Sequence, residues 1–209
     1  MQNPSQSPES LLLSARVGVV DSMGVLLQLY GNYLKLLATT QLDAKLRSRV
    51  SPSDVVQETL LEAHRDFPTF RGSTEPELLA WLRRILLNNL GKLVEQHIVT
   101  EKRDIRREYS LERAHERWER SSVNLRNELV GDGPTPSAAF EQLEASRVLA
   151  DQVAELPDDY RTVIVKRHLE GLPFKEIAEQ MGRSPGAVRM LWLRAIDILR
   201  ERFREEGLL

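Results

Sequence analysis

Three arginines near the C-terminus have the chemistry and the spacing to contact DNA. Arg183, Arg189 and Arg194 belong to the segment 172–202, LPFKEIAEQMGRSPGAVRMLWLRAIDILRER. A guanidinium group can donate two hydrogen bonds to one guanine, whereas other basic contacts more often bind phosphates and set the register. Arg189 lies beside the small residues Gly186 and Ala187, near the helix end that usually enters the major groove. The pattern therefore predicts DNA recognition; an amphipathic surface helix whose arginines serve solubility is the alternative.

The residues around these arginines predict the helix-turn-helix that would position them. Ala178 is small where two helices would cross, Gly182 can take a positive φ in the turn, and Val188 can pack back onto the first helix. Ser184 can cap the second helix, and Pro185 suits its first turn, where no amide donor is needed. Cap, turn and periodicity agree, so a DNA-binding module is expected here.

A second set of residues could hold an unpaired base. Trp81, Arg84 and Asn88 are spaced by three and four, so they share one face of a helix. An aromatic ring can stack on a base while an arginine and an amide bind its backbone. A half-buried tryptophan beside an arginine that satisfies it is an equally good interpretation.

The elements that must position these residues are almost all helical. No run alternates as a strand would, so we predict an all-α fold of two small helical domains joined by a flexible linker, the C-terminal one containing the helix-turn-helix. The domains are expected at 8–108 and 138–207. The linker is expected at 109–137, which ends in a Gly-Asp-Gly-Pro-Thr-Pro cluster. Outside the helix-turn-helix, the predicted helices cover about 26–38, 52–65, 75–97, 138–155 and 158–170.

Several details of these helices follow from local signals. Ser51 is the candidate cap of the helix at 52–65, Gly31 is a tolerated interruption of the first helix, and Gly171 closes the helix at 158–170. Periodicity also assigns side chains to the core. The residues expected to be buried include Val55, Val56, Thr59 and Leu60, and on the recognition helix Leu191, Trp192, Leu193 and Ile196.

Charge is unevenly distributed although the net charge is only −2. Residues 83–107 contain seven Lys or Arg against three Asp or Glu, and residues 183–204 contain six against two. One predicted helix instead carries the acids Asp54, Glu58, Glu62 and Asp66. Two basic stretches and a separate acidic face favour contact with nucleic acid on one side and with protein on another. Ordinary solvated helix faces would produce the same pattern.

Composition argues against several classes of protein. There is no cysteine, no apolar run of membrane-spanning length and no signal peptide, so we expect a cytoplasmic protein without membrane contact. No phosphate-binding glycine loop or nucleophile elbow is present. The four histidines show no spacing typical of metal ligands: His64, His97, His115 and His168. We therefore predict no catalysis, no cofactor and no metal.

Two segments together resemble one protein family. SPSDVVQETLLEAHRDFPTFRG followed by ELLAWLRRILLNNL resembles the second conserved region of bacterial RNA polymerase sigma factors of the extracytoplasmic-function (ECF) type. LPDDYRTVIVKRHLEGLPFKEIAEQMGRSPGAVRMLWLRAIDILRERF resembles their fourth region. The two segments occur in the family's order, separated by a linker, and cover about residues 11–203. The resemblance implies a non-catalytic, dissociable initiation subunit that binds core polymerase and promoter DNA and helps melt the promoter.

The resemblance implies a role for each segment. The acidic helix matches the one that docks on the clamp of core RNA polymerase, and the polymerase flap is a second expected contact. An anti-sigma protein is a further candidate partner. The residues expected to bind core polymerase are Asp54, Val55, Gln57 and Glu58.

Both DNA contacts are also implied by the resemblance. The loop 67–72 and the following helix match the part that holds the minus-ten element as a single strand, with Phe70, Arg71, Trp81, Arg84, Asn88 and Lys92 as the contact residues. The helix-turn-helix matches the module that binds the minus-thirty-five duplex, with Arg183, Ser184, Gly186, Ala187, Arg189 and Arg194 as the contact residues.

This chain departs from the family pattern at three positions. Lys92 stands where an aspartate is frequent, Glu95 where an arginine is frequent, and Leu191 where a basic residue is common. Leu191 indicates a modified promoter preference. The basic segment 102–108 resembles a subgroup feature, for which phosphate contact and a solvated helix extension are the two interpretations.

Two other classes of function remain as alternatives. A transcription regulator with a similar helix-turn-helix would act without docking on the polymerase, but its partner domain would usually be α/β, and the N-terminal half here shows no strand pattern. A helical adaptor that binds only protein would need neither the capped turn nor the arginine-bearing helix.

Overall fold

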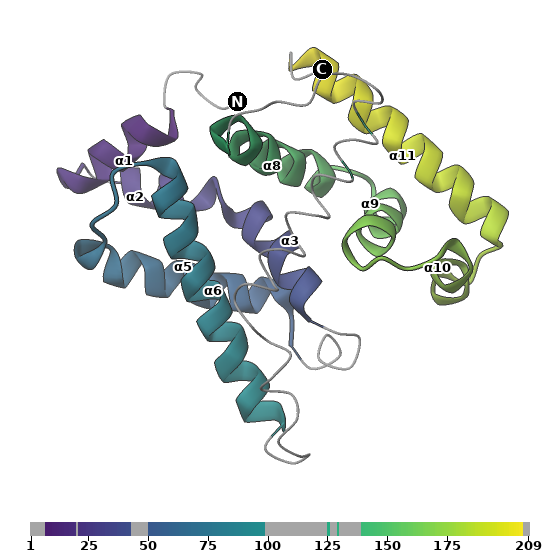
Figure 1. Ribbon diagram of the computed structural model, residues 1–209, viewed down its shortest axis with the longest axis horizontal. Helices are drawn as coiled ribbons and strands as arrows, with labels where there is room; N and C mark the ends of the chain where they lie inside the picture. Colours follow the sequence, from purple (N-terminus) through teal and green to yellow (C-terminus); the bar gives the residue numbers. More distant parts are fainter. Residues whose placement is uncertain are drawn as a thin grey trace. The chain divides into compact units, whose positions relative to one another are not determined.

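The computed structural model describes residues 7–19, 21–42, 50–98, 125, 129 and 139–206, with the backbone alone at 94–98 and 139–145. Throughout these residues the regular structure is helical and no strand occurs, which confirms the all-α prediction (Figure 1). The chain divides into two compact units, Met1–Leu111 and Glu112–Leu209. No helix in the described ranges is long and apolar enough to cross a membrane.

The N-terminal unit is built around the contact between two helices, α5 (Pro52–Asp66) and α6 (Glu75–Ile98), joined by the 3₁₀ turn η1 (Phe67–Thr69). Helix α3 (Gly31–Gln41) packs on α5 and α6, while α1 (Pro8–Arg16) packs on α2 (Ser22–Gln28). Leucines and two tyrosines fill the core between these helices. Its largest fully buried side chains are Tyr30, Tyr33, Leu12, Leu26, Leu34, Leu37, Leu78, Leu79, Leu82 and Leu86.

The single helix expected at 26–38 is wrong: the chain turns between α2 and α3. The break lies at Leu29 and Tyr30, and Gly31 begins α3 instead of interrupting one helix. Tyr30 has a φ of −101° and a ψ of 0°, and its hydroxyl group donates to Glu75 Oε1 over 3.0 Å. The burial of Tyr30 and its bond to α6 therefore favour a turn here. The helix propensity of the segment is too weak to oppose this, because the next residue is glycine.

The predicted start of α5 is confirmed. Ser51 Oγ accepts a hydrogen bond from Ser53 N at 3.2 Å, so this side chain satisfies one of the amides that a helix start leaves unpaired. Val55, Val56 and Thr59 are buried as predicted, but Leu60 is only half-buried. Ala63 completes the inward stripe instead, because a helix returns to the same face four residues after Thr59.

The C-terminal unit consists of α8 (Ala139–Ala154), α9 (Asp158–Ile164), the π-helical turn η3 (Val165–Leu169), α10 (Phe174–Met181) and α11 (Pro185–Glu205). The long α11 packs on α8, α9 and α10. The helix expected at 158–170 is present, but its last turn widens into the π form. Gly171 follows it with the predicted positive φ, +73°. The buried apolar residues include Leu149, Val153, Val163, Ile164, Ile177, Val188, Ala195, Ile196, Leu199 and Phe203.

The linker predicted at 109–137 lies outside the described residues except at two positions. Leu125 and Leu129 are helical and buried, and the Leu129 carbonyl oxygen accepts a hydrogen bond from Arg200 Nε at 3.2 Å. The basic segment 102–108 is also outside the described residues.

Candidate nucleic-acid interface

The helix-turn-helix forms as the sequence predicts. Gly182 adopts a φ of +62°, and Ser184 Oγ accepts a hydrogen bond from Ala187 N at 3.2 Å. Arg183 N donates back to the Ala178 carbonyl oxygen at 3.0 Å, closing the end of α10. Ala178 and Val188 are buried where the two helices meet, with 2% and 0% of their surfaces exposed. The turn and both helix ends are thus fixed by hydrogen bonds inside the motif.

The predicted minus-thirty-five contact residues all lie on the surface. Arg183 and Ser184 are in the turn, and the other four lie in the first three turns of α11. All six residues are exposed: Arg183, Ser184, Gly186, Ala187, Arg189 and Arg194. DNA contact by each stays a prediction.

The expected burial on α11 is right for one residue only. Ile196 is in the core with 2% of its surface exposed, but Leu193 is 41% exposed, and Leu191 and Trp192 are half-buried. The inward stripe of α11 runs through Val188, Ala195 and Leu199. At 100° per residue, Leu193 falls far from that stripe.

Two of the arginines are oriented by neighbours within the C-terminal unit. Arg183 forms a salt bridge with Asp159 of α9. The Arg189 guanidinium lies 5.5 Å from the centroid of the Phe174 ring, and that of Arg167 lies 4.8 Å from the same centroid. Cations are attracted to the face of an aromatic ring. Phe174, at the first position of α10, therefore orients two basic groups beside the recognition helix, a role that no sequence pattern indicated.

A half-buried histidine supports α11 through a hydrogen bond. Trp192 Nε1 donates to His168 Nε2 at 2.9 Å, and the Trp192 ring also meets the Phe174 ring at 5.7 Å, edge to face. Burial, assisted by the nearby charge of Arg167, lowers the pKa of His168 to about 4. His168 is consequently neutral near pH 7 and can accept the indole hydrogen bond. Sequence spacing gave no signal for this contact, because the partners are 24 residues apart.

On α5 of the N-terminal unit, the predicted core-binding residues divide into two groups. Asp54, Gln57 and Glu58 are exposed on one face, together with Leu61, which is 67% exposed. Val55 has 1% of its surface exposed, so its side chain lies inside the unit and is not part of this face. Helical spacing places the four exposed residues side by side, giving an acidic face with an apolar residue in it.

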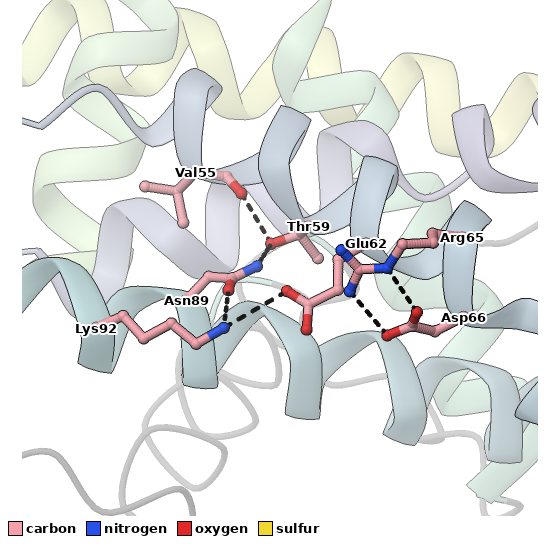
Figure 2. Close-up of polar contacts among 7 residues, drawn as sticks. All are labelled: Val55, Thr59, Glu62, Arg65, Asp66, Asn89 and Lys92. Atoms are coloured by element: carbon pink, nitrogen blue, oxygen red, sulfur yellow. Dashed lines mark hydrogen bonds and ion pairs between the residues drawn. The ribbon is translucent and has the colours of Figure 1, made fainter.

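Figure 2 shows the polar contacts that join α5 to α6. Thr59 Oγ1 donates to the Val55 carbonyl oxygen at 2.8 Å and lies 3.5 Å from Asn89 Nδ2, which donates to it. Lys92 Nζ donates to Asn89 Oδ1 at 3.2 Å and lies 3.8 Å from Glu62 Oε2. Thr59 and Asn89 are buried, so this chain of contacts satisfies polar groups inside the helix pair.

These contacts pair some of the acidic residues of α5 with basic groups and fix the position of Lys92. Glu62 is paired with Lys92, and Asp66 is paired with Arg65 at 2.8 Å, which lowers the pKa of the Asp66 carboxyl group. The acidic face therefore concentrates at Asp54 and Glu58. The Lys92 ammonium, predicted to contact the minus-ten element, lies between Glu62 and Asn89, although its side chain is 61% exposed.

The loop before α6 carries an aromatic cluster. Phe70 stacks on Trp81 with ring centroids 4.9 Å apart, and Phe67 lies 6.4 Å from Trp81. Trp81 is half-buried, as the alternative interpretation predicted, but its stacking partner is Phe70. Arg16 of α1 donates to the Gly72 carbonyl oxygen, and its guanidinium lies 5.9 Å from the Phe70 centroid. This contact from α1, which sequence reasoning missed, ties down the loop.

Gly72 and Glu77 fix the path of the same loop. A Cβ atom on Gly72 would lie 2.4 Å from Phe70 Cζ and 2.7 Å from Glu77 Cβ, so only glycine fits. Glu77 Oε2 accepts hydrogen bonds from the backbone amides of Ser73 and Thr74 at 2.7 and 3.0 Å, which lowers the pKa of the Glu77 carboxyl group. Beyond the loop, Arg71, Arg84 and Asn88 are exposed, the last two on the outer face of α6.

The described residues contain no group of three or more His, Asp or Glu arranged to hold a metal ion. What the two units do offer is an exposed acidic helix face, an aromatic loop beside exposed polar groups, and an arginine-bearing helix-turn-helix.

The low pKa of His168 predicts a pH dependence of stability. Between its ordinary value of 6.5 and about 4, the unfolded chain binds a proton at this residue and the folded unit does not. The free energy of unfolding should therefore fall as pH falls through that window, by up to about 1.4 kcal/mol per pH unit. We expect His168→Gln, which keeps an acceptor for Trp192, to remove this part of the slope in urea unfolding followed between pH 7 and 4.

The matched control is His64→Gln, which removes an exposed histidine of α5. It should leave the pH dependence of the C-terminal unit unchanged. Identical slopes for the wild type and His168→Gln would contradict the assignment of His168 as the titrating group.

Comparison with known proteins agrees with this geometry. The family model for sigma-70 region 4 matches residues 146–199, which include the helix-turn-helix. The chain is 31% identical over 157 residues to an ECF RNA polymerase sigma-E factor of Haemophilus influenzae, covering 75% of this chain and 77% of that protein. It is 29% identical over 152 residues to the ECF RNA polymerase sigma factor SigW of Bacillus subtilis, covering 73% and 75%.

A sigma-E factor of Escherichia coli, also an ECF RNA polymerase sigma factor, is 31% identical over 160 residues, which cover 75% of this chain and 78% of that protein. These matches extend well beyond the helix-turn-helix, so they include the helices that carry the acidic face and the aromatic loop. With the two helical units and their exposed residues, they show that the chain belongs to the family of ECF RNA polymerase sigma factors.

Proposed function

We propose that this chain binds core RNA polymerase through the exposed face of α5 and directs it to promoters. The observation that carries the proposal is the exposed row Asp54, Gln57 and Glu58, with Leu61 beside it. The carboxylates can pair with basic groups of the polymerase clamp, and the leucine adds apolar area at one end of the row. Charged and apolar residues combined in this way are typical of protein interfaces that must be both specific and separable.

The same unit would hold the melted minus-ten element. Arg84 and Asn88 are exposed one and two turns along α6 from Trp81, and Arg71 is exposed in the loop. Arginine and amide groups can bind the backbone of a single strand, while the Phe70–Trp81 stack offers aromatic surface for an unpaired base. Because Thr59 and Asn89 join α5 to α6, polymerase docking and strand capture would act through one helical pair.

The C-terminal unit would bind the minus-thirty-five element as duplex and contact the polymerase flap. Free protein with a net charge of −2 should bind duplex DNA weakly, since phosphate neutralisation supplies most of the affinity. Two weak contacts held on one polymerase gain strength through their effective concentration. An anti-sigma protein that held this factor inactive would compete for the α5 face or for the exposed end of α11.

The polymerase contact is tested by reversing the charge of the α5 face. Asp54→Arg combined with Gln57→Ala should weaken association with core polymerase by at least about 2 kcal/mol, because an interfacial charge pair is replaced by a repulsive one. Both side chains are exposed, so the fold should be retained, as circular dichroism can verify. Association is measured by titrating labelled chain with core enzyme.

Glu201→Arg is the matched control, since it makes the same charge change at an exposed position of α11. It should leave core association near the wild-type value. Wild-type association of the double variant would exclude the α5 face as the polymerase contact.

The promoter contact is tested separately on α11. Arg189→Ala should weaken binding of the reconstituted holoenzyme to its promoter by about 1–3 kcal/mol, the value of one bidentate base contact. Core association should not change. Arg204→Ala, an exposed arginine near the other end of α11, is the control and should have a small effect on either measurement. Loss of core association in Arg189→Ala would contradict this division of roles.

A further inference from the structure

Two apolar side chains are exposed on the outer face of the recognition helix. Met190 is 50% exposed and Leu193 is 41% exposed, on consecutive turns of α11. They lie in the second and third turns of the helix that Ser184 caps, near the end that usually enters a major groove. Two apolar side chains exposed close together at such a surface are available for an apolar contact.

The side chain of Met190 lies on the side of α11 away from the core. The buried residues of α11 include Val188, Ala195 and Leu199, which cluster on one side of the helix. At 100° per residue, Gly186 and Met190 lie on the opposite side, one turn apart. Gly186 has open space around its Cα, with no atom within 4 Å of a Cβ built there. The helix can therefore approach a surface closely at Gly186 and present Met190 next to it.

Arg194 is exposed on the same face as Met190, one turn further along α11, and other basic groups lie beside this face. Arg183 is paired with Asp159, and Arg189 is drawn toward the ring of Phe174. Around the helix, Met190 lies between Arg189 and Arg194, both of which are exposed. Its thioether side chain is long, unbranched and able to adapt its shape.

We infer that Met190 reads a thymine in the upstream promoter element by contact with its 5-methyl group. In the major groove the thymine methyl group is the apolar feature that distinguishes base pairs, and apolar side chains are its usual partners. The inference rests on the proposed function, since it requires α11 to enter the groove of the minus-thirty-five duplex. It names one residue and one base of that interface, which would make an apolar contact within a site that also contains arginines.

The experiment replaces thymine by uracil, which removes the methyl group and leaves all hydrogen bonds of the base pair. The full chain and core polymerase are first used to select upstream elements from a random duplex pool. Each thymine of the selected element is then changed singly to uracil, and holoenzyme binding is measured. With wild-type chain, at least one uracil substitution should weaken binding about fourfold, the value of one buried methyl group.

Met190→Ala makes the assignment specific. In this variant the same uracil substitution should have no effect, because the apolar partner is already gone. Glu201→Ala, an exposed residue on the same side of α11 about three turns further on, should keep the full uracil effect. Circular dichroism of both variants should match the wild type, since both positions are exposed.

Two results would overturn the inference. Either no thymine responds to loss of its methyl group, or the response persists unchanged in Met190→Ala. A holoenzyme that forms but selects no duplex would instead defeat the proposed role of α11, and a chain that does not associate with core would defeat the proposed function itself. If Met190→Ala weakened core association while leaving the uracil effect intact, the apolar face would be a protein contact.

Discussion

The packing of α5 on α6 is the constraint on which the N-terminal unit depends, and inside it Asn89 Nδ2 of α6 lies 3.5 Å from Thr59 Oγ1 of α5. It joins α5, which carries the acidic face, to α6, which carries Arg84 and Asn88. A buried amide without a partner would cost about 1–3 kcal/mol, so the two helices are held in one register. Lys92 extends this contact to Glu62 at the surface. A protein partner bound to α5 and a DNA strand bound to α6 would therefore share one rigid support.

In the C-terminal unit, the long helix α11 is exposed along one side and packed against the other helices along the opposite side. Val188, Ala195 and Leu199 supply the apolar side, and the Trp192–His168 hydrogen bond supplies a polar contact next to it. Phe174 then connects this support to the surface through two guanidinium groups. The Phe174 ring contacts both the Trp192 ring and the Arg189 guanidinium. A change in the packing of Phe174 would therefore also move Arg189.

Features set by short stretches of sequence were predictable, and features set by tertiary contacts were not. The caps at Ser51 and Ser184 and the positive φ of Gly182 depend on residues within three positions, and the structure has all of them. At the break between α2 and α3, Tyr30 is buried and donates a hydrogen bond to Glu75, 45 residues away, a contact that periodicity within 26–38 does not reveal. Leu193 is 41% exposed although it is hydrophobic, because its position on α11 is far from the buried stripe. Residue type and spacing predicted the arginines of the helix-turn-helix and the row Trp81, Arg84 and Asn88, and the family resemblance implied the other candidate site residues. Their supports, Arg16, Phe174 and His168, come from distant parts of the sequence.

The central proposal is that this chain binds core polymerase and directs it to its promoters. The most direct measurement is transcription from a library of random upstream sequences by purified core polymerase, with and without the chain. We expect the chain to direct initiation to a small set of templates that share two spaced elements. Core polymerase alone should select none of them. Binding of the chain to duplex DNA with no association with core, and no change in initiation, would contradict the proposal.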